Sequence, residues 1–336
     1  MKRPTDMDNP SNMATPVQQA PSTTGSEAVA PRFSVIIPLY NKEAEIERTV
    51  RSVLAQTLQP LEIVIVDDGS TDNSRHVVEQ IDSPLIRLHT QQNAGSGAAR
   101  NRAIALSRGE YIAMIDADDE WMPNYLQQIA RLIRLYPDCG GWCSAFDIVS
   151  DDGVFPSDSP RYEGIIEDYF REAMTRYVCI TSATTIARRV FDQVGGFPEG
   201  MRMGQDTYMW IKLARSFKVA YTPRRLCRYN RIAQNRTTSI YRGDNCRESF
   251  KDFYTGGADT MLDEYAARIA LSRAIIISAK GGTEEARQTE RFFSYTRMNR
   301  RILTKLRVIN RLPKPWRWNA LRAYNYLAWK IARKGL

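Results

Sequence analysis

Two acidic clusters in the first third of the sequence have residue types and spacing suited to binding a cation and a polar ligand. Asp116-Ala117-Asp118 follows an apolar run, and carboxylates at positions i and i+2 suit a hard divalent cation that phosphate oxygens also hold. Asp67-Asp68-Gly69-Ser70 follows another apolar run, where a side chain can hydrogen-bond a base or ribose. Both clusters have a structural alternative, a helix cap by Asp118 or Asp119 and a plain strand-to-helix turn.

Other signatures of nucleotide or metal binding are missing from the sequence. No G-x-G-x-x-G follows the first apolar run, and there is no Walker A sequence. Gly95-Ser96-Gly97 is glycine-rich but lacks the lysine that follows in a phosphate-binding loop. Because there are only 2 histidines, we expect any catalytic base to be a carboxylate. The 5 scattered cysteines indicate neither a disulfide framework nor a zinc site.

Alternating strand and helix patterns over residues 33–135 must position these clusters. Strands are predicted at 33–37, 61–66, 85–88 and 111–115, with helices at 42–56, 72–80, 96–107 and 123–135. Such alternation predicts βαβ units and a parallel sheet. Ligands bind at the carboxyl ends of parallel strands, so we expect Pro38–Asn41, Asp67–Ser70 and Asp116–Asp119 to converge in one crevice.

The remaining segments are predicted more coarsely. Residues 1–31 are rich in Pro, Ser, Thr, Gln and Asn without apolar periodicity, so we expect a disordered leader. Residues 150–230 predict short strands and a helix near 206–216. Beyond about residue 245 the pattern predicts helices at 261–280, 284–308 and 316–334.

Composition and charge exclude several classes of protein. The 336 residues are 43% hydrophobic and 25% charged, which is typical of a globular protein. The net charge of +9 originates in the C-terminal segment, where residues 291–336 hold 13 Lys or Arg and no Asp or Glu. The slightly acidic body disfavours nucleic-acid binding. No apolar run is long enough to span a membrane, and we see no signal peptide.

Five motifs, in the right order and at the right spacing, together resemble family 2 glycosyltransferases. They are Val35-Ile-Ile-Pro-Leu-Tyr-Asn-Lys42, Val66-Asp-Asp-Gly-Ser-Thr-Asp72, Asn93-Ala-Gly-Ser-Gly-Ala-Ala-Arg-Asn101, Asp116-Ala-Asp-Asp-Glu-Trp121, and Gly195-Gly-Phe197 with Gly204-Gln-Asp206 and Trp210. The resemblance covers about residues 32–235 and implies the α/β GT-A fold, a Rossmann-like, mostly parallel sheet flanked by helices. It also implies a catalytic domain at 32–240, with a nucleotide-sugar half at 32–120 and an acceptor half at 121–240. The helical, basic C-terminal extension at 241–336 follows this domain.

The resemblance also implies roles for individual residues, because this family transfers sugars from nucleotide donors, usually UDP-sugars, with inversion. The residues that match positions around the donor nucleotide are Pro38, Tyr40, Lys42, Asp67, Asp68, Arg100, Asn101 and Asp116. Among them, Asp68 matches the residue that binds uracil, and Asp116 matches the carboxylate close to the ribose. Asp118 matches the ligand of Mn²⁺ or Mg²⁺, with Asp116 as a second ligand. Asp206 matches the general base.

One position departs from the family pattern, because Gln205 replaces the Glu of the usual Glu-Asp pair. The alternative for Asp206 is a helix N-cap. The chemistry agrees with the implied roles: a cation stabilises the departing nucleoside diphosphate, and a carboxylate takes the proton of the attacking hydroxyl. We expect acceptor contacts within residues 145–245, with Arg202 and Trp210 as further candidates.

The C-terminal segment combines its basic residues with aromatic ones, including Trp316, Trp318, Tyr324 and Trp329. This composition favours an interfacial helix on an anionic membrane. The alternatives are a helix that packs on the catalytic domain and a basic arm for nucleic acid. An enzyme that uses a lipid-linked acceptor would need a membrane surface.

We therefore predict a metal-dependent, inverting glycosyltransferase with a nucleotide-sugar donor and a glycan or lipid-linked saccharide acceptor. The resemblance implies bacterial surface or exopolysaccharide synthesis, at the cytoplasmic face of the membrane and without a nucleic-acid partner. The alternatives are a non-catalytic nucleotide-sugar-binding protein, a basic-tailed adaptor and a nucleotidyltransferase. Asp118 and Asp206 argue against the first, and a nucleotidyltransferase should carry a basic phosphate loop where this chain has only Lys42.

Overall fold

The computed structural model describes residues 31–201, 203–233 and 249–333, with the backbone alone for residues 326–333. These residues belong to one compact unit that begins at Pro31. The predicted leader lies outside the described residues, apart from Pro31. The predicted boundary between residues 240 and 241 also lies outside them, so it stays a prediction.

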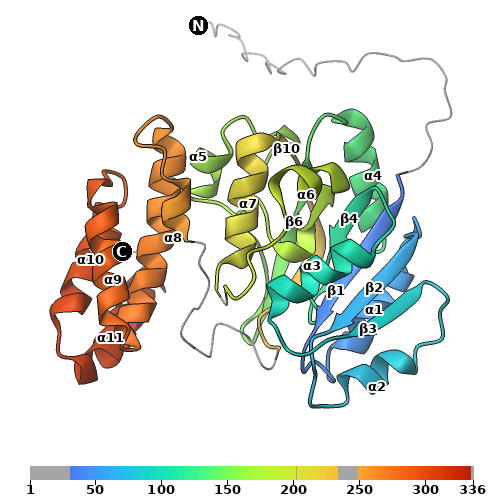
Figure 1. The fold of residues 1–336 in the computed structure, drawn as a ribbon, viewed down its shortest axis with the longest axis horizontal. Helices are drawn as coiled ribbons and strands as arrows, with labels where there is room; N and C mark the ends of the chain where they lie inside the picture. Colours follow the sequence, from blue (N-terminus) through green and yellow to red (C-terminus); the bar gives the residue numbers. More distant parts are fainter. Residues whose placement is uncertain (1–30, 202, 234–248, 334–336) are drawn as a thin grey trace, which may run out of the picture. The chain divides into compact units, whose positions relative to one another are not determined.

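A mixed sheet runs through the part of the chain that ends at Asn230 (Figure 1). The strand order is β3-β2-β1-β4-β9-β6-β10-β5, with β7 paired to β6 and β8 paired to β10. The strands are β1 (Phe33–Leu39), β2 (Glu62–Asp67), β3 (Ile86–Thr90), β4 (Tyr111–Met114), β5 (Glu120–Trp121), β6 (Gly141–Ser150), β7 (Gly153–Pro156), β8 (Gly164–Ile165), β9 (Thr184–Ala187) and β10 (Val219–Asn230). The first four strands are parallel to one another, as predicted. Beyond β4, antiparallel β9 joins them to β6, and β6 and β10 run parallel.

Helices connect these strands and flank the sheet (Figure 1). They are α1 (Ile46–Leu54), α2 (Ser74–Glu79), α3 (Ser96–Leu106), α4 (Tyr125–Leu135), α5 (Tyr169–Ala173), α6 (Arg188–Val194) and α7 (Gln205–Ser216), with the short 3-10 helix η1 at Thr181–Ala183. The β-branched residues of β1 and β2 form the centre of the core, because Val35, Ile36, Ile63 and Val64 are fully buried. A helix on each connection therefore covers strands that are apolar on both faces.

The strand register places both acidic clusters at one edge of the sheet. Asp67 at the end of β2 pairs with Leu39 at the end of β1, and β4 lies on the other side of β1. Ile115, which follows β4, donates its backbone N–H to the carbonyl of Ile36. The segment after β4 therefore runs beside the end of β1, which confirms the predicted convergence.

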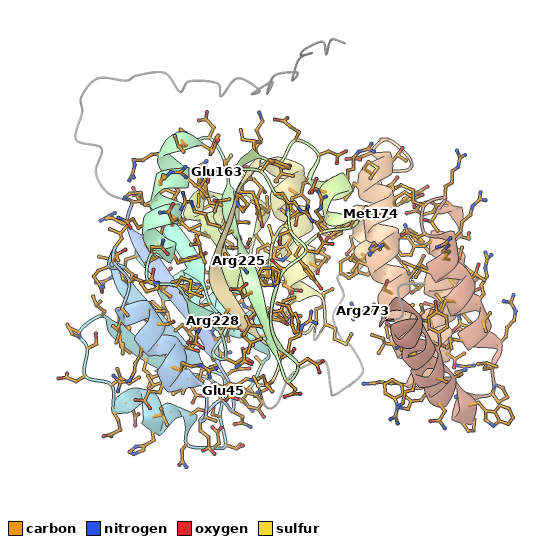
Figure 2. All side chains as sticks on the ribbon, turned by 180° about the vertical axis from the view of Figure 1, so that it is seen from behind. Glu45, Glu163, Met174, Arg225, Arg228 and Arg273 are labelled. Atoms are coloured by element: carbon orange, nitrogen blue, oxygen red, sulfur yellow. The ribbon has the colours of Figure 1, made fainter. Side chains whose placement is uncertain are left out.

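The C-terminal region consists of η3 (Phe250–Phe253), α8 (Thr260–Ala279), α9 (Thr283–Phe292), η4 (Phe293–Tyr295), α10 (Arg300–Arg311) and α11 (Lys314–Arg333). The ring of Tyr265 in α8 contacts Tyr169 and Phe170 of α5. Met174, which follows α5, is buried on the same side of the molecule (Figure 2). Within the described ranges, no helix combines the length and the apolar character needed to cross a bilayer.

The prediction of a single helix over 284–308 is wrong, because the chain turns between α9 and α10. The buried carboxylate of Glu264 in α8 accepts hydrogen bonds from the backbone N–H groups of Arg297 and Met298 and from the side chain of Asn299. A helix through these residues would turn their N–H groups toward its own carbonyls. The turn instead satisfies a carboxylate from another helix, which a local pattern does not record.

Candidate active site

A pocket of about 630 Å³ opens where the acidic clusters meet the N-termini of α3 and α7. Eight of the predicted site residues line it: Pro38, Tyr40, Lys42, Asp68, Arg100, Asp116, Asp118 and Asp206. Asp67 and Asn101 lie outside its lining. Most of the residues predicted from the sequence are therefore brought together, although they span 169 positions from 38 to 206.

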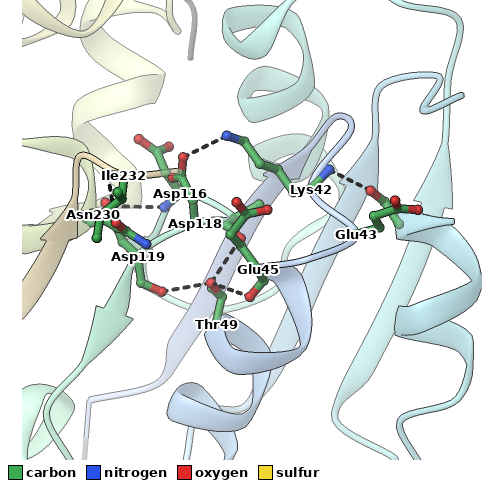
Figure 3. A network of polar contacts seen from close by, with 12 residues as sticks. Lys42, Glu43, Glu45, Thr49, Asp116, Asp118, Asp119, Asn230 and Ile232 are labelled. Carbon is green, nitrogen blue, oxygen red and sulfur yellow. Dashed lines mark hydrogen bonds and ion pairs between the residues drawn. The ribbon is translucent and has the colours of Figure 1, made fainter. Parts of the chain in front are cut away.

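Two ion pairs hold the carboxylates that follow β4. The ammonium of Lys42 lies 2.8 Å from Oδ2 of Asp118, and the guanidinium of Arg100 lies 2.6 Å from Oδ1 of Asp116. Figure 3 shows Lys42 reaching Asp118 from the turn after β1. Burial, followed by the negative charge of Asp116, raises the pKa of Asp118 against the opposing effect of Lys42. We call Asp116 and Asp118, which follow β4, the acidic edge. Its negative charge is not fully compensated by the surrounding groups.

Asp119, the third carboxylate of this cluster, has a structural role. It is fully buried, and it accepts a hydrogen bond from the hydroxyl of Ser182. It also accepts one, at 2.7 Å, from the backbone N–H of Asn230 (Figure 3). Burial and the neighbouring Asp118 and Asp116 raise its pKa well above the usual range. The N-cap of α4 is Asn124, so the alternative of a cap by Asp118 or Asp119 is wrong. Asp119 instead ties the acidic loop to η1 and to the end of β10.

Asp68 shapes one wall of the pocket through its carboxylate. It accepts hydrogen bonds from the backbone N–H groups of Ala94 at 2.9 Å and Gly95 at 2.8 Å, and from the amide of Gln91 at 2.7 Å. These bonds hold the turn that leads into α3. The neighbouring Asp67 accepts the N–H of Ser70 and closes the turn after β2, so it supports the site from outside the pocket.

Arg100 and Asn101 are adjacent on α3, but their side chains have different contacts and different roles. Arg100 is buried over the ring of Phe197 at 5.3 Å, and within the described residues its Nε and Nη1 have no hydrogen-bond partner. The side chain of Asn101 accepts the N–H of Phe197 at 2.8 Å and donates to its carbonyl at 2.9 Å. A Cβ on Gly196 would meet Asn101 at 2.3 Å, so that position requires glycine. Asn101 therefore fixes the turn after α6.

Asp206 enters the pocket from the first turn of α7. The N-cap of α7 is Gly204, in a left-handed conformation with φ of 84°, so the N-cap alternative for Asp206 is wrong. Its Oδ1 accepts the N–H of Thr207 at 2.7 Å. Its Oδ2 makes no hydrogen bond to any residue that the structure describes. One oxygen is thus fixed and the other is available to a ligand.

Gln205, the departure from the family pattern, joins the two helices that frame the pocket. Its amide donates to the hydroxyl of Ser96 at 2.7 Å, which links the start of α7 to the start of α3. The side chain of Gln205 is buried against the lining. Gln205 therefore fixes the position of Asp206 relative to the turn before α3, which is the turn that Asp68 stabilises.

Several lining residues were missed by the sequence reasoning: Thr181, Met201, Met203, Tyr229 and Asn230. They belong to η1, the loop before α7 and the end of β10, and no motif in this part of the sequence marks them. Trp210 is 3% exposed and packs against Phe197, so it is a core residue and not an acceptor contact. Arg202 lies outside the described residues.

The donor set of the acidic edge suits a hard divalent cation. Asp116 and Asp118 offer carboxylate oxygens, and their mutual repulsion is a charge imbalance that a cation relieves. Among the described residues, no group of three or more His, Cys, Asp or Glu could hold a metal ion by itself. Mn²⁺ or Mg²⁺ would therefore complete its coordination with water and with oxygens of a bound molecule, as is usual for Mg²⁺ with phosphates.

Comparisons with known proteins agree with this geometry. The model of glycosyl transferase family 2 matches residues 34–195. An uncharacterized glycosyltransferase of Nostoc sp. is 46% identical over 106 residues, covering 31% of this chain and 33% of the relative. TuaG of Bacillus subtilis, whose name refers to teichuronic acid biosynthesis, is 29% identical over 62% of this chain and 82% of its own length. The chain spans about a third of the length of the first two curated relatives, at 33% and 30%.

The structural comparison extends beyond the sequence match. The crystal structure of S. aureus TarS 1–349 in complex with UDP-GlcNAc is 20% identical, with a TM-score of 0.56 over 80% of this chain and 74% of TarS. This likeness shows that the chain has the GT-A fold of that glycosyltransferase. The parallel strands β1 to β4, the acidic edge after β4 and the motif residues that line the pocket agree with this match. Residues 34–195 therefore belong to glycosyl transferase family 2.

Proposed function

We propose that this protein transfers a sugar, with inversion, from a nucleotide-sugar to a hydroxyl of a glycan or lipid-linked saccharide. One observation carries the proposal: a single pocket is lined by the carboxylate pair Asp116 and Asp118 and by Asp206 from another helix. The first two suit a cation, and the third suits a base. The family of residues 34–195 supports transfer of a sugar, and the UDP-GlcNAc complex of TarS supports a UDP-sugar as donor.

The pocket wall offers groups for the donor nucleotide. A diphosphate brings negative charge, and the ammonium of Lys42 and the N–H groups of Arg100 supply positive charge on the lining. The first turn of α3 also lines the pocket, and the N-terminus of a helix favours anions. Tyr40, which is 43% exposed, offers a ring face for a base. When bound to Asp116 and Asp118, Mn²⁺ or Mg²⁺ would stabilise the charge on the leaving nucleoside diphosphate.

Asp206 acts as the general base in this proposal. Thr207 holds Oδ1, so Oδ2 faces the acceptor hydroxyl and takes its proton as the hydroxyl oxygen forms a bond to the anomeric carbon. The bond from that carbon to the nucleotide breaks, and its electron pair stays on the diphosphate oxygen. Because attack occurs opposite the leaving group, the configuration inverts and no covalent intermediate forms.

A thermal-shift titration tests the donor site. We expect UDP and UDP-sugars to raise the melting temperature in a Mn²⁺-dependent manner, more than GDP or CDP does, because a ligand that binds the folded state stabilises it. The Asp118→Ala variant should lose this shift. The Asp192→Ala variant, which changes an exposed carboxylate on α6 outside the pocket, should keep it. Absence of a shift with every nucleotide in the wild-type protein would contradict the proposal.

We further propose that α11 binds the surface of an anionic membrane, which would bring the pocket to a lipid-linked acceptor. Trp316, Trp318 and Tyr324 are 69%, 41% and 54% exposed, and Lys305 lies 3.8 Å from the ring of Tyr324. Packing accounts for another part of α11, where Leu321 is buried in the core. Exposed aromatic rings beside cations suit an anionic bilayer surface. The protein would then be a peripheral protein at the cytoplasmic face of a bacterial membrane. Its role there would be in surface or exopolysaccharide synthesis.

Vesicle cosedimentation tests the membrane surface. We expect the full chain to bind vesicles that contain phosphatidylglycerol and to bind phosphatidylcholine vesicles much less. A Trp316→Ser/Trp318→Ser double variant should bind the anionic vesicles more weakly. The Phe155→Ser variant, which removes an exposed aromatic ring on β7, is the matched control and should bind like the wild type. Equal binding by all three proteins would exclude this role for the tryptophans.

A further inference from the structure

Lys42 and Asp118 form an ion pair that is almost enclosed by the pocket. Their charged atoms are 2.8 Å apart, and the two side chains are 11% and 16% exposed. The backbone of Lys42 is anchored, because its N–H donates to the hydroxyl of Ser74 at 2.6 Å. The preceding Asn41 has a positive φ of 49° and bonds to Thr71. The start of the Lys42 side chain is therefore fixed, while its four-carbon stem can move the ammonium.

The position of the ammonium matters for any other cation at this carboxylate. The ammonium occupies Oδ2 of Asp118, and two cations on one carboxylate repel each other strongly where water is largely excluded. A buried lysine without an anion is also unfavourable, since a charge that loses its partner in a partly buried site pays a large desolvation penalty. A divalent cation can thus displace the ammonium from Asp118 at lower cost when a bound anion lies nearby to accept it.

The second cation at this edge is arranged differently. Arg100 is 4% exposed, its guanidinium lies over the ring of Phe197, and it bonds to Asp116. Its planar group is held by a ring and a carboxylate together, so it can stay on Asp116 when a ligand binds. Lys42 carries a compact charge on a long stem and is the cation that can exchange.

We propose that Lys42 is an exchangeable counter-cation, which Asp118 gives up for a divalent metal when a diphosphate enters and accepts the lysine ammonium. This inference rests on the proposed function and deepens it by coupling metal binding to nucleotide binding. The metal by itself must compete with Lys42 for Asp118. The metal together with a nucleoside diphosphate meets no such competition, because the diphosphate supplies oxygens to both cations. Binding of Mn²⁺ and of UDP is therefore cooperative, and Lys42 is the origin of much of the coupling.

Titration of the full-length protein with Mn²⁺, followed by the electron paramagnetic resonance signal of the free ion, measures this coupling. It requires no catalytic turnover. The test variant is Lys42→Met, which keeps the length of the stem and removes the charge. The matched control is Arg48→Met, because Arg48 bonds to Glu120 and to the backbone carbonyl of Asp118 but not to the Asp118 carboxylate. Each protein is titrated without nucleotide and again with saturating UDP.

We expect Lys42→Met to bind Mn²⁺ without nucleotide about tenfold more tightly than the wild type, because the competing charge is gone. With Mn²⁺ present, the same variant should bind UDP about tenfold more weakly, because the diphosphate loses the ammonium. Opposite signs of the two changes are not expected from a lysine that merely supports the fold. Arg48→Met should change both affinities much less.

The outcomes separate this inference from the proposed function. If the wild type binds Mn²⁺ with UDP but Lys42→Met binds Mn²⁺ alone no more tightly than the wild type, the counter-cation role is wrong and the metal site stands. If no protein binds Mn²⁺ even with UDP, both the metal site and the role of Lys42 are wrong. Lys42→Gln serves as a second neutral variant if Lys42→Met does not fold. The melting temperature of each variant shows whether it is folded.

Discussion

Glu62 is a buried carboxylate and Asp118 a largely buried one, and they lie at opposite ends of the parallel strands. Glu62 begins β2 and accepts hydrogen bonds from Ser34 at 2.7 Å, from Arg87 and from both the backbone and the side chain of Arg108. Burial raises the pKa of Glu62, yet the hydrogen bonds from Ser34 and Arg87 outweigh it and lower the pKa. Asp118 follows β4 and has one ammonium and a like-charged neighbour, so its pKa is raised.

The difference separates a group that stabilises the fold from a group that is suited to a ligand. At the amino ends of the strands, four donors fill both oxygens of Glu62, so binding another cation there would gain little. At the carboxyl ends, Asp116 and Asp118 repel each other. Among the described residues, each of them has a single ion pair, to Arg100 and to Lys42 respectively. A site that binds a cation must contain negative charge that the protein itself does not fully compensate. Such charge lowers the stability of the folded protein. The predictions below test this contrast.

The largest expected effect is on activity. Asp118→Asn should lower kcat/KM by about 10³-fold, because a metal that stabilises leaving-group charge is worth several kcal/mol. Its melting temperature should fall less than that of Glu62→Gln, because the loss of the partner of Lys42 is partly offset by removal of the repulsion with Asp116. Release of UDP from the donor, followed with a coupled assay, measures the rate. A loss of stability as large as that of Glu62→Gln would remove the contrast with Glu62.

Asp206→Asn should lower kcat by about 10²–10³-fold, because the acceptor proton then has no base. The KM for the donor should change little, since Asp206 comes from α7 and is not one of the carboxylates that would hold the metal and the diphosphate. Steady-state kinetics with a varied donor concentration separates the two constants. Asp252→Asn is a useful control, because Asp252 bonds to Tyr208 of α7 from outside the pocket. A kcat for Asp206→Asn equal to that of the wild type would exclude a role as base.

Glu62→Gln should have the opposite profile, with lost stability and retained activity. We expect the free energy of unfolding to fall by about 2 kcal/mol, the typical loss when hydrogen bonds to a charged group are weakened. Urea denaturation measures it. The control Glu79→Gln removes an exposed ion pair with Arg75 and should change stability by less than about 1 kcal/mol. If Glu62→Gln were as stable as this control, the network at the amino ends would have no structural role.

The smallest effect is a dependence of stability on pH. Because the folded pKa of Glu62 lies below its ordinary value of 4.5, the ionised carboxylate stabilises the fold at pH values above 4.5. This contribution is lost as the pH falls from 4.5 through the folded pKa. The difference in unfolding free energy between wild type and Glu62→Gln should therefore be constant above about pH 5 and shrink below about pH 4. A difference that grows on acidification would show that the pKa shift has the opposite sign.

Local patterns predicted the nucleotide half of the fold well because its elements are regular. The apolar runs of β1, β2 and β4 lie within a residue or two of their predicted positions, and helix α3 begins at the predicted Ser96. In the second half, β6, β9 and β10 pair across sequence separations of about 40 to 80 residues. No period within a window of the sequence encodes such partners. The same limit explains why the turn between α9 and α10, which Glu264 stabilises, was missed.

The site shows the same division at the level of single residues. The types and spacing of Asp116, Asp118 and Asp206 are enough to mark them as candidates, and all three line one pocket. Sequence proximity could not distinguish Asp118 from Asp119, or Arg100 from Asn101. In each pair one side chain faces the pocket and its neighbour braces a distant segment, which is η1 and β10 for Asp119 and the turn at Phe197 for Asn101.

The sequence by itself thus determined which chemical groups the protein possesses and at which strand ends they lie, because strand periodicity and turn residues are local properties. Only the tertiary structure decided which of these groups share a pocket, which are consumed by internal hydrogen bonds, and that Lys42 pairs with Asp118 across 76 positions. The physical reason is that charge pairing and burial depend on distances between segments, and folding alone sets those distances.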